Sequence, residues 1–300
     1  MIVFLSFIEP LKTTFRRDNP IQTPRDSQPM SIRRCPPTPS FYIRPFLVKL
    51  QITFFLLLIF YLSFQPCFAL TGEEIRRFQT LLMGKSIGER IALWAERFIG
   101  VPYDMDPLGE YVSKATIVAD ERVDCMYLTF RAVELALSHT PEEAIQVALE
   151  KRFRSKGVFK DGHVMNYDDR FEYGEDMIES GKWGKEITPA VGKMTKIEGS
   201  RGKDFVEVLL PDELMQGMKR LRSGDVIFFV TKPEKRKVGE IIGHIGIIKV
   251  EKAGGNQPGN EIFLIHASGT KEKGGAVKKV LLEEYLSKMP FTGVKITRVR

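Results

Sequence analysis

The chain has 300 residues, a net charge of +7 and a hydrophobic fraction of 43%. Its first 69 residues hold eight basic side chains and only three acidic ones, so the remaining 231 residues carry a net charge of about +2. Lysines in that remainder are interleaved with acids and no ladder of aromatic residues accompanies them, which argues against nucleic acid as a partner. The remainder is long enough for one domain with a sizeable core.

The N-terminal part predicts an export signal. Residues 1–40 mix Pro, Ser, Thr and Arg without apolar periodicity, so we predict an extension that is disordered or, with Met30 as the start codon, not translated. Residues 41–69 predict a signal peptide, because basic residues precede an apolar run and Cys67 and Ala69 fit the −3 and −1 positions of a cleavage site. The alternative is an uncleaved anchor, which would be the chain's one contact with a membrane. Either way we expect an exported protein, periplasmic or extracellular.

Residues 70–300 predict a single domain in which helices come first and strands last. Amphipathic helices are expected at residues 71–79, 87–99, 125–139, from 140 onward, and 212–221. The weak pattern at about 153–210 predicts an insertion, partly helical around 173–180. Short strands are expected at residues 115–119, 226–230, 245–250, 262–265, 276–277 and 294–299. Helices followed by antiparallel strands, without alternation of the two, favour an α+β fold.

Cys125 is the one cysteine that remains after residue 69, so it has no partner for an internal disulfide. The roles left to it are nucleophile or small buried core residue. It begins the predicted helix at 125–139, where unpaired backbone N–H groups and the helix dipole favour a thiolate. This position favours the nucleophile.

Two histidines offer a base and its support. His244 begins a predicted strand directly after Gly243, and a small neighbour allows a substrate to approach closely. His266 ends the predicted strand 262–265, from which it can hold His244 in one tautomer, although alone it fits a core histidine equally well. A zinc site built from Cys125 and the two histidines is an alternative, but the sequence has no close ligand pair. We therefore expect no metal and no cofactor.

Several short motifs together resemble one known family. In chain order they are Gly100-Val101-Pro102-Tyr103, Asp124-Cys125, Gly224-Asp225-Val226-Ile227, Gly243-His244-Ile245-Gly246-Ile247 and Leu264-Ile265-His266-Ala267-Ser268. This order resembles the signature of the NlpC-type papain-like cell-wall hydrolases, and most closely their branch similar to N-acetylmuramoyl-L-alanine amidases. The resemblance implies a papain-like α+β fold, with the nucleophile at a helix start packed on a C-terminal antiparallel sheet or partial barrel.

The same resemblance implies an activity and its catalytic residues. It predicts a secreted, cell-wall-associated cysteine hydrolase that cuts an amide bond in peptidoglycan stem peptides, with Cys125 as nucleophile, His244 as base and His266 orienting His244. The backbone N–H of Cys125 and the hydroxyl of Tyr103 are expected to stabilise the oxyanion. The bond that is cut is either the muramoyl to L-alanine amide or the γ-D-glutamyl to diamino acid bond. A thiol acyltransferase and a non-catalytic wall-binding module are the alternatives.

Four further residues are candidates for substrate binding. Asp124 either caps the helix of Cys125, which we favour, or contacts a substrate amine. Arg170 and Tyr173 match an Arg-x-x-Tyr segment of the resembling family, and Arg170 either pairs with a peptide carboxylate or is a surface arginine. Ser268 follows His266 in the final motif and is expected to line the site.

Overall fold

The computed structural model describes residues 70–300, except residue 238 and residues 255–258 and 271–272. The chain divides into two compact units, and all described residues belong to the second, Cys67–Arg300. The predicted extension and signal peptide, residues 1–69, lie outside the described residues. Within the described part, no helix combines the length and apolarity needed to cross a bilayer.

Most helices precede the main strands. They are α2 (Gly72–Leu82), α3 (Ile87–Arg97), α4 (Glu110–Ser113), α5 (Cys125–Leu137), α6 (Pro141–Lys151), α7 (Gly174–Ser180), α8 (Thr188–Val191), α9 (Pro211–Gly217) and α10 (Leu282–Lys288), with short 3-10 turns η1 (Tyr167–Asp169), η2 (Met218–Arg220) and η3 (Pro233–Lys235). The first two begin where capping boxes satisfy the free backbone N–H groups. Thr71 exchanges hydrogen bonds with Glu74, and Ser86 does so with Glu89. The predicted starts of these helices are confirmed.

The strands form one large antiparallel sheet and a small hairpin. They are β1 (Phe159–Lys160), β2 (His163–Val164), β3 (Lys185–Glu186), β4 (Met194–Glu198), β5 (Phe205–Leu209), β6 (Val226–Thr231), β7 (Ile242–Lys252), β8 (Asn260–Thr270), β9 (Gly274–Leu281) and β10 (Phe291–Arg298). The order of the large sheet is β4-β5-β10-β6-β7-β8-β9, and β3 also pairs with β10. All pairings described in it are antiparallel. The predicted α+β class is confirmed.

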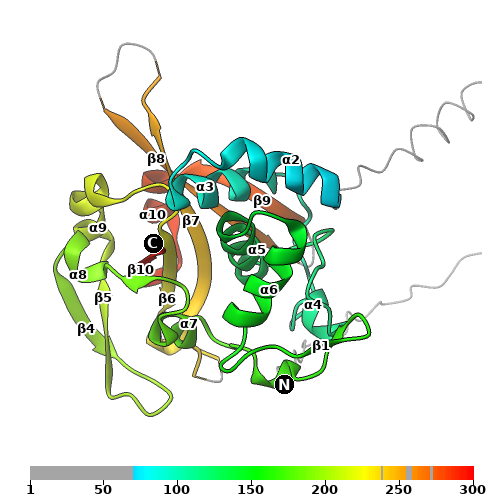
Figure 1. Cartoon of the computed structure of the whole chain (residues 1–300). Coiled ribbons are helices and arrows are strands. Elements are labelled where there is room, and N and C mark those ends of the chain that lie inside the picture. Colours follow the sequence, from blue (N-terminus) through cyan, green and yellow to red (C-terminus); the bar gives the residue numbers. More distant parts are fainter. Residues whose placement is uncertain (1–69, 238, 255–258, 271–272) are drawn as a thin grey trace, which may run out of the picture. The chain divides into compact units, whose positions relative to one another are not determined.

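The sheet separates two hydrophobic cores because side chains of successive strand residues point to opposite faces. Phe228 of β6 belongs to the core under α2, α3 and α5, whereas Phe229 belongs to the core with α9 and α10. Figure 1 shows α2, α3, α5 and α6 gathered on one side of β6 and β7, and α8 and α9 on the other side, next to the β4–β5 hairpin at one edge of the sheet. The helix that begins at Cys125 is thus packed directly on the central strands.

The strand predicted at residues 115–119 is wrong. This segment is turns and bends, and Ala115 has a left-handed φ of 49°. Its apolar side chain Ile117 is buried in a small cluster with Phe153 and Val164 instead of joining the sheet. The carbonyl of Ala115 accepts a hydrogen bond from the N–H of Val164, so the β1–β2 hairpin satisfies it.

Two other differences affect the site. The strand predicted to end at Ile265 continues as β8 to Thr270, so His266 lies within the strand and not at its end. Helix α10, with Tyr285 on its second turn, was not predicted at all. In the predicted insertion, residues 153–210, the helical stretch is α7, while β4 and β5 extend the main sheet unexpectedly. Most side chains of β4 are exposed or half-exposed, and so they give little apolar signal.

Candidate active site

Helix α5 begins at Cys125 because Asp124 caps it. Asp124 has extended backbone angles, and its Oδ1 accepts a hydrogen bond of 2.6 Å from the backbone N–H of Tyr127. This satisfies one of the N–H groups that a helix start leaves free. The capping role favoured for Asp124 is confirmed. Cys125 itself is partly exposed at the first position of the helix.

A buried ion-pair network holds α5 below the cysteine. The Arg131 Nε donates to Asp120 Oδ1 at 2.7 Å, and the Arg152 Nε donates to Glu134 Oε1 at 2.6 Å. An Nη1 of Arg131 lies 3.6 Å from a Glu134 oxygen and joins the two pairs. All four side chains are at most 2% exposed, and their charges cancel. The network therefore ties α5 to the C-terminal end of α6 and to the loop before Cys125.

The two histidines form a hydrogen-bonded pair across adjacent strands. The Nε2 of His244 lies 2.8 Å from the Nδ1 of His266. In the register of β7 and β8, Ile247 lies opposite Ile265, so Gly246 faces His266 and His244 is its diagonal neighbour. A side chain at position 246 would bring a Cβ within 3.3 Å of the Cβ of His266, so glycine leaves room for that ring.

Burial keeps both imidazoles neutral. It lowers the pKa of His244 to about 3, with a further contribution from His266, and the pKa of His266 to about 4, with a further contribution from Lys278. The two side chains are 9% and 4% exposed. At neutral pH one of the two facing nitrogens, Nε2 of His244 or Nδ1 of His266, carries the proton of this hydrogen bond. If the Nε2 of His244 carries it, the Nδ1 of His244 is left with a free lone pair.

The thiol of Cys125 lies beside the strand that carries His244. The backbone N–H of Ile245, the residue after His244, hydrogen-bonds to the thiol and lowers its pKa. Burial and the negative charge of Asp124 outweigh this effect and raise the pKa of Cys125 to about 12. The structure thus brings Cys125 and the histidine strand together, with the cysteine as a neutral thiol.

Tyr103 also lies beside the thiol. Its backbone bridges to Val123, just before the α5 cap, and its N–H donates to the carbonyl of Gly275 at 2.9 Å. Burial, then the negative charge of a Cys125 thiolate, raises the pKa of Tyr103, so its hydroxyl stays protonated. A Cβ at Gly269 would lie 2.8 Å from the Tyr103 ring, which therefore packs over the glycine that follows Ser268. Ser268 is half-buried and pairs with Ala276 of β9.

The structure places Arg170 and Tyr173 in contacts of their own. Arg170 pairs with Glu172 at 3.1 Å and donates to the carbonyl of Tyr167 at 3.3 Å. The ring of Tyr173 lies 3.9 Å from the guanidinium carbon of Arg201. Among the described contacts, neither side chain touches Cys125 or the histidine pair.

Three residues near the thiol were missed in the sequence. Tyr285 of α10 contacts the rings of both histidines. Burial raises the pKa of Tyr285, and the negative charge of a Cys125 thiolate adds to this effect. Asp104 is buried. Burial of Asp124 raises the pKa of that carboxyl to about 6, and the negative charge of Asp104 adds to this effect. Glu240 precedes β7 and raises the pKa of Cys125. In the sequence, the one feature that could have pointed to Asp104 is its position directly after Tyr103.

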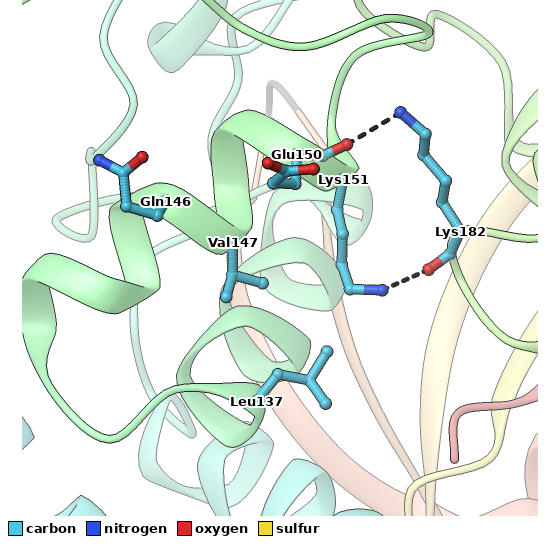
Figure 2. Close-up of a pocket in the computed structure, with 6 residues that line it drawn as sticks. All are labelled: Leu137, Gln146, Val147, Glu150, Lys151 and Lys182. Atoms are coloured by element: carbon cyan, nitrogen blue, oxygen red, sulfur yellow. Dashed lines mark hydrogen bonds between the residues drawn. The ribbon is translucent and has the colours of Figure 1, made fainter.

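A separate depression of about 370 Å³ lies by α6, as Figure 2 shows. It is lined by Leu137, Gln146, Val147, Glu150, Lys151 and Lys182. The Nζ of Lys182 donates to the Glu150 carbonyl at 2.9 Å, and the Nζ of Lys151 donates to the Lys182 carbonyl at 2.5 Å. None of the candidate catalytic side chains lines it. Over the described residues, no set of three His, Cys, Asp or Glu side chains is arranged to hold a metal ion.

A scan against protein-family models and a search of curated proteins each find no match to the chain. Solved structures do match. An N-acetylmuramoyl-L-alanine amidase from Bacteroides uniformis has a TM-score of 0.52 and 20% identity, over 71% of this chain and 98% of that one. A Legionella pneumophila protein of the DUF1460 family has a TM-score of 0.55 and 16% identity, over 75% and 93%.

A Bacteroides fragilis protein described as a candidate xylanase matches with a TM-score of 0.51 and 21% identity, over 69% of this chain and 100% of that one. Identities this low establish a shared fold and leave the activity open. The three descriptions also differ from one another. The chain therefore has the α+β fold of these solved structures, and its function has to be argued from the site.

Proposed function

We propose that the protein is a cysteine hydrolase that cuts an amide bond in peptidoglycan stem peptides. One observation carries the proposal: His244 is hydrogen-bonded to His266 on the adjacent strand, and the backbone N–H of the next residue, Ile245, hydrogen-bonds to a thiol at a helix start. A nucleophile, a base and a group that orients the base are the parts that covalent amide hydrolysis needs. The amidase among the solved structures of this fold supports the choice of substrate.

The reaction begins from a neutral pair, because the pKa of Cys125 is raised and that of His244 is lowered. As the sulfur of Cys125 forms a bond to the amide carbon, its proton moves to the free Nδ1 of His244. His266 accepts the Nε2–H of His244 and holds this tautomer. The positive charge on His244 then exists only while the tetrahedral intermediate carries its negative charge.

The oxyanion has two donors beside it. The backbone N–H of Cys125 lies at the start of α5, beside the thiol whose pKa it lowers, and the Tyr103 hydroxyl is protonated. Collapse breaks the C–N bond, and His244 returns its proton to the leaving amine. Water then attacks the thioester, gives a proton to His244, and releases the carboxylic acid and the thiol.

The scissile bond is one of two. Cleavage of the muramoyl to L-alanine amide would release the whole stem peptide, whereas cleavage after γ-D-glutamate would shorten it. We further propose that residues 41–69 direct export, so that the enzyme meets peptidoglycan outside the cytoplasm. The papain-like assignment of the fold belongs to the same proposal, since it follows from the motifs around Cys125 and His244.

Digestion of purified muropeptides, followed by mass spectrometry, tests this function. The full-length protein should yield new fragments with the mass of one added water, and Cys125→Ala should yield none. His163→Ala removes an exposed imidazole and serves as the matched control, which should retain full activity. Fragments that persist in Cys125→Ala would overturn the assignment. An acyl adduct without added water would indicate a transferase, and unchanged muropeptides that still bind would indicate a binding module.

A further inference from the structure

Tyr285 contacts both histidines from a helix outside the motifs. Its ring centroid lies 5.0 Å from that of His266, at an interplanar angle of 67°, and 6.4 Å from that of His244. Tyr285 is half-buried. It belongs to α10, whose Leu282 and Leu286 are buried in the same core as Phe229. No hydrogen bond of its hydroxyl is found among the described residues. Tyr285 therefore contacts the two histidines through its ring.

Two more aromatic rings complete the surroundings of His244. Phe291 of β10 lies parallel to His244 at 6.1 Å, with an interplanar angle of 6°. Phe229 of β6 is fully buried and lies 5.8 Å from His244 and 5.1 Å from Tyr285. Three rings from three different elements thus lie near one imidazole, in addition to the ring of His266.

Such an enclosure matters because water competes for the hydrogen bond between two neutral rings. An imidazole N–H in contact with water exchanges partners freely, and the ring can then rotate or change tautomer. Apolar walls remove this competition and strengthen the bond that remains. Phe229 and Phe291 belong to the sheet itself, but Tyr285 reaches the pair from a separate two-turn helix. A substitution at Tyr285 can therefore remove one of the three rings without altering a strand of the sheet.

We propose that Tyr285 is a positioning residue that closes an aromatic box around the His244–His266 hydrogen bond and keeps water away from it. The role rests on the proposed function to the extent that an oriented His244 serves as the base. The box itself follows from the ring contacts alone. Burial, the first cause of the lowered pKa values of both histidines, agrees with it.

Three variants of the full-length protein separate the ring from its hydroxyl and from the helix. Tyr285→Ala removes the wall, and Tyr285→Phe keeps the ring without the hydroxyl. Leu286→Ala is the matched control, because it destabilises α10 from the same core without touching an imidazole. The chain has only four histidines, so side-chain nitrogen NMR titrations can assign each one.

In Tyr285→Ala, we expect the titrations of His244 and His266 to move up by at least one pH unit. The acid limb of kcat/KM should move up by the same amount, with no comparable change at neutral pH. Tyr285→Phe and Leu286→Ala should both titrate as the unmodified protein does. Unmoved titrations in Tyr285→Ala would overturn the proposal, as would a shift of the same size in Tyr285→Phe or Leu286→Ala. Because the NMR readout needs no substrate, it remains decisive even if muropeptides are not cleaved.

Discussion

At the scale of single residues, Cys125 is subject to opposing influences. Its place at the start of α5 favours the thiolate, as the sequence led us to expect, and the N–H of Ile245 favours it as well. Burial and the neighbouring charge of Asp124 act against it and prevail. The thiol therefore rests neutral, and in the mechanism we propose it becomes a nucleophile only when His244 takes its proton.

Alkylation kinetics can test the neutral thiol. We expect iodoacetamide to modify Cys125 at pH 7 at least tenfold more slowly than a free thiol, because the thiolate is the reacting form. The rate should rise with pH without a plateau up to pH 10. Mass spectrometry of the peptide that contains Cys125 measures both. A fast rate that is constant from pH 5 upward would instead indicate a resting thiolate and imidazolium pair.

At the scale of elements, α5 depends on charges that are buried beneath it. Its Arg131 and Glu134 face Asp120 and Arg152 in a network that is almost wholly closed to water. Burial of charges is tolerated only because each one is paired, and removal of one partner leaves another unpaired. The network is consequently a sensitive point for the position of Cys125.

A substitution in this network should be strongly destabilising. We expect Glu134→Gln to lower the free energy of unfolding by about 3 to 5 kcal/mol, since Arg152 loses its carboxylate partner and Arg131 keeps only Asp120. Glu142→Gln breaks the exposed pair with Arg76 and should change the free energy of unfolding far less. Urea denaturation monitored by tryptophan fluorescence compares the two. Equal effects of the two substitutions would contradict the buried network.

At the scale of the whole molecule, the residues of the proposed site come from both the helical part and the sheet of the described domain. Cys125 and Tyr103 come from the helical part, whereas His244, His266 and Tyr285 come from the sheet and α10. Loss of sheet packing would therefore separate the base from the nucleophile. The same packing holds two uncharged histidines in the interior, which links folding to pH.

This linkage predicts a loss of stability in acid. Both histidines have pKa values lowered from 6.5, so the unfolded chain binds protons first as the pH falls. Stability from the pair is complete above pH 6.5 and is lost as the pH falls toward 4 and 3. Between pH 7 and pH 5 we expect a loss of about 2 kcal/mol for each histidine, measured by urea denaturation.

Asp124 acts in the opposite direction, because its pKa is raised from 3.8 to about 6 and its stabilising effect is lost as the pH rises through 6. His266→Asn should reduce the acid loss by about 2 kcal/mol, the share of one histidine, whereas His163→Asn, at an exposed site, should leave it unchanged. Equal acid losses in the unmodified protein and in His266→Asn would contradict a neutral buried pair.

The sequence by itself determined the starts of α2, α3, α5 and α6, the α+β class and the residues offered as candidate nucleophile, base and orienting group. These follow from local rules, such as the cap at Asp124 and the glycine beside His244, because the chain nearby is enough to satisfy them. It did not reveal the turns at 115–119, the full length of β8, or α10. Those features depend on which distant segment of the chain forms hydrogen bonds or packs with each of them.

Only the tertiary structure decided the ionisation and the neighbours of the site. Helix position alone favoured a thiolate, but the pKa of Cys125 is set mainly by burial, which no local pattern reports. Tyr285 has no motif, and it reaches the histidines only because α10 packs against the far face of the sheet. Local backbone chemistry can be read along the chain, whereas desolvation and ring contacts arise from segments that are remote in sequence.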